Sequence, residues 1–145
     1  MDERIKEHLK HLQRYQLHLR ESQKIPEEQF VNDDIQVASV ERFLHLAIES
    51  CLNIGNRLIS ILQFEIPVET PETYADIFKS LLKMKIINVA LSDRMILMAK
   101  FRNRLVHLYW DIDRRELYRI IQEDIKDFSE FQDAIVTFLS KRDTD

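Results

Sequence analysis

Three side chains of different chemistry lie close together near residue 100, in the pattern Arg102-Asn103-x-x-x-His107-x-Tyr109. Arginine carries a permanent positive charge on a planar group that binds a phosphate through two parallel hydrogen bonds. Histidine exchanges protons near neutral pH, so it can act as a general acid or base. The pattern therefore indicates chemistry on a phosphate, with Arg102 stabilising charge and His107 moving a proton.

Chance alone explains part of this pattern. From the composition, an Arg followed by His five positions later is expected about 0.4 times in a chain of this length. The pair by itself is therefore uninformative. Requiring a Tyr two positions further lowers the expectation to about 0.01. The triple is a hypothesis that needs structural context.

A single ideal helix would not place Arg102 and His107 on one face. Five residues turn a helix by about 500°, which leaves the two side chains about 140° apart. Three arrangements could still bring them to one phosphate. The helix could end near residues 111–113, the long arginine could reach around, or two copies of the motif could meet across a two-fold axis. The last makes the most chemical sense, because it gives a cleft with two Arg and two His.

A purely structural reading has about equal weight on spacing alone. Arg102 and Arg104 would then be solvated side chains at a helix end, next to two aspartates. His107 would cap helix carbonyls, whose partial negative charge favours the protonated ring.

The composition bounds the fold and the location. A length of 145 residues suits one domain, 1–145, and one Gly with three Pro favours long helices over a sheet with many hairpins. A net charge of −4 gives no global field for nucleic acid, so RNA would bind at a local basic patch. The charged N-terminus is unlike a signal peptide, and no apolar run approaches the roughly 18 residues of a membrane span. We therefore expect a cytoplasmic all-α protein.

Helical spacing of apolar residues predicts an antiparallel bundle of about five helices. Their approximate ranges are 2–21, 33–62, 71–82, 89 to 107 or 109, and 114–139, with a frayed tail at about 141–145. The predicted N-caps are Asn32, Thr70, Asn88 and Asp113. Gly55 falls inside a helix, where it costs about 1 kcal/mol relative to Ala. A close helix–helix or subunit contact would explain it.

Residues 99–110 resemble the signature of the HEPN superfamily, specifically its HepT-like toxins, in which Arg, a polar residue, three residues, His, one residue and Tyr follow in order. Segments 47–56, 71–82 and 111–113 resemble, in register, the long second helix, the linker with the third helix, and the turn after the motif. The resemblance covers about 40–120 and is more specific than the motif alone. It implies an all-helical homodimer whose active cleft forms between the two motif copies.

The resemblance also implies an activity and a partner. Many HEPN proteins are metal-independent endoribonucleases, and HepT-like members are typically encoded beside MntA, a minimal nucleotidyltransferase antitoxin that adds AMP to the motif tyrosine. Carried over by position, Arg102 and His107 would be catalytic, Asn103 the supporting polar residue and Tyr109 the modified tyrosine. We therefore expect a ribonuclease without cofactors that acts on RNA and is inactivated by an MntA-like partner.

Other charged residues carry weaker expectations. Arg104 and Lys100 could contact RNA, with Arg94, Arg114 and Arg115 extending a basic rim, although each is more simply an ordinary surface charge. The three histidines of the first helix, which are His8, His11 and His18, lack the neighbouring ligands of a metal site. His45 lies four residues from both Glu41 and Glu49, which favours pairing on the helix surface, and either glutamate could also orient His107.

Two other functions fit the same residues. The chain could be a catalytically silent helical dimer that binds a nucleotidyltransferase or a nucleotide through the same cleft. It could also serve chiefly as a regulated substrate for AMP transfer. The intact Arg102 and His107 favour the ribonuclease, whereas the acidic net charge weakens it slightly.

Overall fold

The computed structural model describes residues 1–144, apart from the side chains of Tyr109 and Thr144. Within this range every regular element is a helix, which confirms the all-α prediction. The elements are α1 (Glu3–Gln23), α2 (Glu27–Val31), α3 (Asp34–Leu62), α4 (Tyr74–Lys83), α5 (Val89–His107), a 3-10 helix η1 (Tyr109–Asp111), α6 (Arg114–Glu123) and α7 (Lys126–Thr144). None of these helices is long and apolar enough to cross a membrane.

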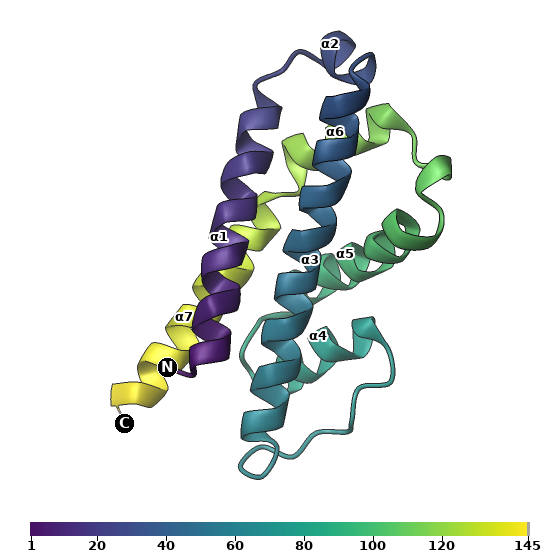
Figure 1. The fold of residues 1–145 in the computed structure, drawn as a ribbon. Coiled ribbons are helices and arrows are strands. Elements are labelled where there is room, and N and C mark those ends of the chain that lie inside the picture. Colours follow the sequence, from purple (N-terminus) through teal and green to yellow (C-terminus); the bar gives the residue numbers. More distant parts are fainter. Residues whose placement is uncertain (145) are drawn as a thin grey trace.

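Helices α1 and α3 form a long antiparallel pair along one side of the molecule (Figure 1). The pair is fastened at the start of α1, where Asp2 accepts hydrogen bonds from the backbone N–H groups of Arg4 and Ile5. The same carboxylate accepts a hydrogen bond from Nη2 of Arg57 on α3, at 2.8 Å. The Arg57 guanidinium lowers the pKa of Asp2 to about 2. One aspartate thus caps α1 and joins it to α3.

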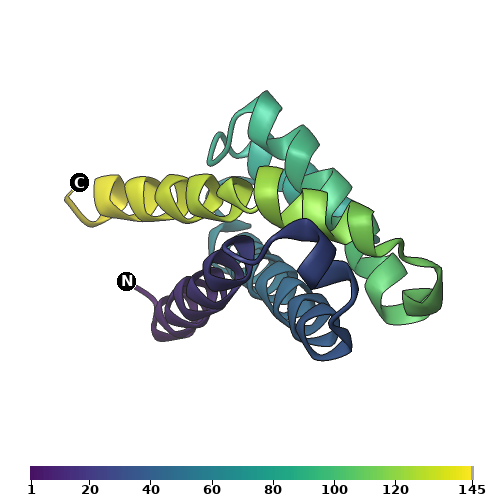
Figure 2. The same cartoon turned by 90° about the horizontal axis from the view of Figure 1, so that it is seen from above.

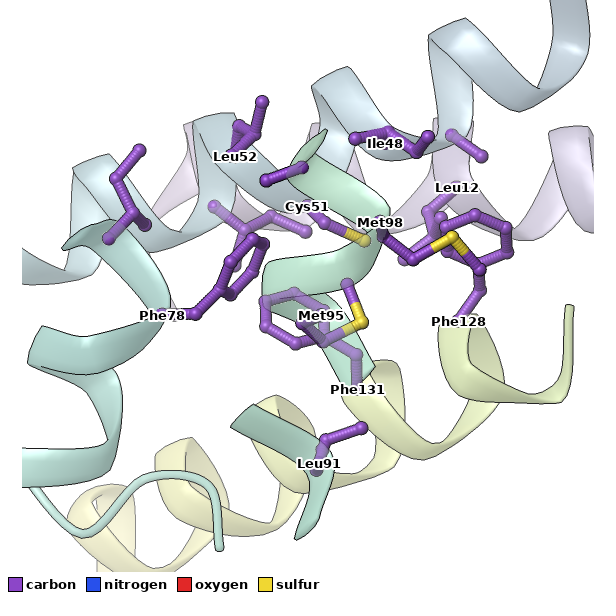
Figure 3. Packing of buried hydrophobic residues seen from close by; sticks show 14 of the residues in the cluster. Leu12, Ile48, Cys51, Leu52, Phe78, Leu91, Met95, Met98, Phe128 and Phe131 are labelled. Atoms are coloured by element: carbon purple, nitrogen blue, oxygen red, sulfur yellow. The ribbon is translucent and has the colours of Figure 1, made fainter. Parts of the chain in front are cut away.

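Helices α4, α5 and α7 complete the core against this pair. Figure 3 shows side chains from α1, α3, α4, α5 and α7 meeting around Cys51 and Met98. The rings of Phe78 on α4 and Phe131 on α7 pack edge to face, with 5.9 Å between centroids. Cys51 is fully buried, and burial raises the pKa of its thiol, as expected of a structural cysteine. This core holds α5, which carries the sequence motif, along much of its length.

Gly55 lies at a close contact between α3 and α4. A Cβ atom at this position would overlap Cγ2 of Ile77 and lie 3.4 Å from Cδ1 of Leu81. The backbone of α3 therefore contacts α4 directly, and any larger side chain would push the helices apart. This confirms that a helix–helix contact accounts for the glycine.

The turn between α4 and α5 is held in a left-handed conformation. Lys85 has φ 62°, and it is the only described non-glycine residue with positive φ. Its N–H donates to the carbonyl of Leu82 at 2.9 Å, while the N–H of Ile86 donates to the carbonyl of Leu81 at 3.0 Å. This pair of bonds is the Schellman arrangement that usually takes glycine at the left-handed position.

Two predicted helix starts were wrong, and local capping explains both. Asp33, not Asn32, caps α3, because Asn32 donates its side-chain amide to the carbonyl of Glu28 and ends the short helix α2, which was not predicted. Thr73, not Thr70, caps α4. Its hydroxyl and the Asp76 carboxylate each accept a backbone N–H of the other residue, a reciprocal capping box. The caps predicted at Asn88 and Asp113 are confirmed.

The last predicted helix is in fact two helices. The chain turns at Asp124 and Ile125, between α6 and α7, although the apolar pattern continues through the turn. In the view from above, α6 and α7 follow one another across the top of the α1–α3 pair (Figure 2). Helix α7 continues to Thr144, through most of the segment for which fraying is predicted, and Arg142 pairs with Glu65 at 2.6 Å.

Candidate active site at the end of helix α5

Helix α5 positions the motif at the edge of the molecule opposite the two chain termini (Figure 1). Asn88 caps the start of the helix by accepting a hydrogen bond from the N–H of Leu91 at 2.8 Å. Met95, Met98 and Phe101 are buried, which fixes the rotation of the helix about its own axis. The motif residues are therefore held by a helix that the core orients.

Arg102 is not the solvated side chain that the purely structural reading predicts. Its side chain is only 14% exposed, and its Nε donates a hydrogen bond to Oε1 of Glu49 at 2.6 Å. Its guanidinium carbon lies 4.7 Å from the ring centroid of Tyr74, within range of a cation–π interaction. Its Nη1 lies 3.5 Å from Oδ1 of Asn103. Residues from α3 and α4 therefore enclose the arginine.

Glu49 is shared between two basic side chains. Besides Arg102, the same oxygen lies 3.5 Å from Nε2 of His45, which confirms the pairing predicted one helical turn apart. Glu41 makes no recorded ion pair within the described residues, and burial raises its pKa. The sequence left open whether either glutamate orients His107, and in the structure Glu49 instead contacts Arg102.

His107 is the last residue of α5 and is exposed. Leu108 leaves the helical conformation at φ −133° and ψ 35°, so the helix ends at His107, which is one of the two ends that the sequence predicts. Within the described residues, no hydrogen bond or ion pair joins His107 to Arg102. The arginine lies against side chains of α3 and α4, whereas the histidine is exposed on another face of the helix, as their angular separation predicts.

The other motif residues lie on the exposed side of the same region. Asn103 is exposed and lines a hollow of about 420 Å³ with residues of α3 and the start of α4, including Asn56, Thr73 and Tyr74. The backbone of Tyr109 opens the 3-10 helix directly after the break, and its side chain lies outside the described part of the structure. Trp110 follows it, with 71% of its side chain exposed.

Most of the predicted basic rim is neutralised. Arg104 pairs through both terminal nitrogens with Glu116, at 2.7 and 3.0 Å, and this bond raises the arginine pKa. Three further arginines also form ion pairs: Arg94 with Asp127 and Glu130, Arg114 with Asp34, and Arg115 with Glu28. Lys100 is exposed and has no recorded ion pair within the described residues. The predicted rim therefore consists mainly of arginines in surface ion pairs. Lys100 is the member of the rim whose charge is available to a ligand.

The histidines of α1 contribute to packing. His18 stacks on Phe43 of α3, with 4.3 Å between ring centroids and planes 8° apart. Among the described residues, no group of three or more His, Cys, Asp and Glu is placed to hold a metal ion.

Glu49 and Tyr74 are the site residues that the sequence did not identify. Both fall in segments that resemble the HEPN pattern, and the sequence indicates Glu49 only as a partner of His45 or as a residue that could orient His107. Their contact with Arg102 joins positions 53 and 28 residues away along the chain, for which periodicity gives no signal.

The chain is similar to several known proteins. The mRNA nuclease HepT of Shewanella oneidensis is 30% identical over 107 residues, which cover 74% of this chain and 77% of that protein. A solved structure of a tri-AMPylated HEPN toxin of S. oneidensis, in complex with an MNT antitoxin, superposes with a TM-score of 0.85 at 25% identity, covering 94% of this chain and 99% of that one.

A third similarity concerns the fold alone. The cytosolic protein YutE of Bacillus subtilis, of unknown function, superposes with a TM-score of 0.79 at 24% identity, covering 95% of this chain and 90% of that one. The model of the family described as ribonuclease HepT-like matches residues 5–135. Because this match spans most of the chain and includes the Arg102–Tyr109 motif, the protein belongs to the ribonuclease HepT-like family.

Proposed function

We propose that this protein is a toxin that cleaves RNA internally in the cytoplasm, without a metal ion. The observation that carries the proposal is that one helix bears both a largely buried Arg102 and an exposed His107, in a chain of the ribonuclease HepT-like family. The similarity to an mRNA nuclease supports RNA as the substrate.

The proposed reaction is an internal attack on the phosphodiester. The RNA 2′-OH attacks the adjacent phosphorus, the bond to the 5′-oxygen breaks, and a 2′,3′-cyclic phosphate is left. His107 takes the proton from the 2′-OH or gives one to the leaving 5′-oxygen, a type of help that contributes about 10²–10⁴-fold. Arg102 stabilises the charge that develops on the non-bridging oxygens, and Asn103 orients the phosphate or the imidazole. Arg104 and Lys100 were the candidate RNA contacts, and Lys100 is the better one because Arg104 already pairs with Glu116.

The cleft of this enzyme is proposed to form between two copies of the chain. Within one protomer Arg102 and His107 lie on different faces of α5, so a second motif offers the simplest way to bring both to one phosphate. Exposed apolar side chains on and beside α5 support this arrangement, including Leu97 and Leu108.

An MntA-like nucleotidyltransferase is the proposed partner, and Tyr109 the residue to which it adds AMP. The similarity to a tri-AMPylated HEPN toxin in complex with an MNT antitoxin supports the partner and the kind of modification, and the resemblance of the motif indicates Tyr109 as the residue. Added AMP would bring bulk and negative charge next to His107, which would repel the RNA backbone.

The test is cleavage of end-labelled RNA, including tRNA and mRNA, in the presence of EDTA. The protein must be unmodified at Tyr109 by mass spectrometry, and His107→Ala is the control. We expect cutting by the wild type alone, with cyclic-phosphate ends. Equal inactivity of both proteins on all RNA classes would contradict the proposal and favour a non-catalytic dimer that binds its nucleotidyltransferase partner.

A further inference from the structure

We propose that Glu49 and Tyr74 are positioning residues that determine which edge of the Arg102 guanidinium faces the substrate. Glu49 fixes the rotation of the group and Tyr74 fixes its plane. This inference rests on the proposed ribonuclease function, because the substrate phosphate is the ligand that the free edge would bind.

The hydrogen bonds of Arg102 leave one edge of the group available. A guanidinium can bind a phosphate side-on, through Nε and one terminal nitrogen, or end-on, through both terminal nitrogens. Glu49 occupies Nε at 2.6 Å, whereas Nη2 makes no hydrogen bond within the described residues and Nη1 has only the long contact with Asn103. The end-on edge is therefore the one that can bind the phosphate.

Tyr74 restricts the remaining freedom of the group. The guanidinium carbon lies over its ring, 4.7 Å from the centroid, so the ring limits how the group can turn. Tyr74 is the first residue of α4, and its backbone is fixed by the capping box of Thr73 and Asp76. The ring is thus attached to a rigid point of the fold.

The shared carboxylate limits how far Glu49 neutralises the arginine. Its Oε1 faces both Nε of Arg102 and Nε2 of His45, and the glutamate side chain is 29% exposed to water. A carboxylate that lies next to two basic side chains and is partly hydrated holds Nε in place without abolishing attraction for a phosphate. Preorganised donors of this kind act mainly in the transition state, because their orientation is fixed before charge develops.

Two other roles for Glu49 make different predictions. If the glutamate merely blocked Arg102, removing it would raise the rate of cleavage. If the ion pair were merely structural, removing it would lower thermal stability and leave kcat unchanged. If it positions Arg102, removal lowers kcat while RNA binding is kept or strengthened, since a negative charge has left the site.

The kinetic test compares four variants with the wild type on one RNA of defined length. We expect Glu49→Ala to lower kcat by roughly 10–100-fold with KM unchanged or lower. Glu49→Gln should keep most of the activity, since its amide oxygen still accepts the Nε hydrogen bond. Tyr74→Phe should match the wild type and Tyr74→Leu should not, because the ring face and not the hydroxyl contacts the arginine.

The matched control is Glu41→Gln, which removes a half-buried carboxylate from the same helix without touching Arg102. It should match the wild type in kcat. A melting temperature is measured for every variant. Glu49→Ala with wild-type kcat, with raised activity, or with a loss matched by partial unfolding at the assay temperature would overturn the proposal.

A second readout does not depend on cleavage. The Nε–H signal of Arg102, assigned by its loss in Arg102→Lys, is followed by NMR while inorganic phosphate is added. We expect the Nη signals to shift and the Nε–H signal to remain, in wild type and in Glu49→Gln. Displacement of Nε–H from Glu49 by phosphate would overturn the assignment of the edge, even if the wild type cleaves no RNA. Absence of cleavage by the wild type would instead reject the proposed function.

Discussion

At the scale of single residues, the surroundings of Arg102 decide what its charge can do. A half-buried ion pair gains more from Coulomb attraction than a surface pair, because less water screens it. The cation–π contact with Tyr74 adds attraction that also fixes orientation. The sequence predicted Arg102, Asn103 and His107 as candidates from residue type and spacing. It could not predict Glu49 or Tyr74 as partners, because those contacts depend on how α3 and α4 pack against α5.

Lys85 offers a test of strain at one residue. Its left-handed conformation costs an L-amino acid about 1–2 kcal/mol, whereas glycine adopts it freely but loses more entropy on folding. We expect Lys85→Gly to increase the free energy of unfolding by about 0.5–1 kcal/mol in urea denaturation. Lys79→Gly, at an exposed position inside α4, should decrease it by about 1 kcal/mol. Equal effects of the two changes would rule out strain at Lys85.

At the scale of elements, the sequence predicted the first residue of a helix only where one residue was the clear candidate for the N-cap. Asn88 and Asp113 stand alone before their helices, and both predictions are confirmed. Asn32 competes with Asp33, and Thr70 with Thr73, and in each case a reciprocal or more local hydrogen bond decided the outcome. The break at Asp124 could not be predicted from periodicity, because apolar residues continue in phase across it.

The contact of α3 with α4 predicts the effect of Gly55→Ala. Alanine favours a helix by about 1 kcal/mol over glycine, but its methyl group would overlap Ile77. Overpacking of this kind costs about 1–3 kcal/mol, so we expect a net loss in the free energy of unfolding of up to about 2 kcal/mol. Asn53→Ala, at an exposed position of α3, should be neutral or slightly stabilising, as measured by urea denaturation.

A double substitution separates the overlap from other causes. Ile77→Ala alone costs about 2–5 kcal/mol through the cavity that it leaves. Combined with Gly55→Ala, it should cost clearly less than the sum of the two single changes, because the new methyl group then has room. Simple additivity of the two changes would show that the methyl group introduced by Gly55→Ala does not meet Ile77.

The fastening of α1 to α3 predicts how stability depends on pH. Asp2 has a pKa of about 2 in the folded protein, below its ordinary value of 3.8, chiefly because of its bond to Arg57. Its contribution is therefore complete above about pH 4 and is lost as the pH falls towards 2. We expect Asp2→Asn, which keeps a capping side chain, to be less stable than wild type at pH 6 but equal to it at pH 2. Melting temperatures of both proteins between pH 2 and pH 6 measure this difference in stability. A difference that does not change with pH would contradict the lowered pKa of Asp2.

At the scale of the whole molecule, one protomer presents only part of the proposed chemistry. Arg102 and His107 are on opposite sides of the end of α5, so the fold of a single chain supplies each group without bringing them together. The five-residue spacing in the sequence already predicted that the two side chains lie on different faces of one helix. It could not choose among the three ways to overcome it, because the choice depends on where the helix ends and on what covers it.

Mixing two inactive variants tests the two-chain cleft. Arg102→Ala and His107→Ala should each be inactive alone. After unfolding and refolding together, mixed dimers would carry one Arg and one His at the shared cleft, and RNA cleavage should return to a measurable fraction of wild type. Sedimentation of each variant provides the control that dimers form. Dimers that form without any return of activity would indicate that both groups act within one protomer.

Trp110 gives the protein an optical probe of its own. It is the chain's single tryptophan, largely exposed, and adjoins the tyrosine proposed to receive AMP. Indole emission changes in colour and intensity with the polarity of its surroundings. Because the chain has one tryptophan, fluorescence excited at the red edge of the absorption band comes from this one location. Arrival of an oligonucleotide, docking of a second chain and attachment of adenylate can thus be timed in the unlabelled protein.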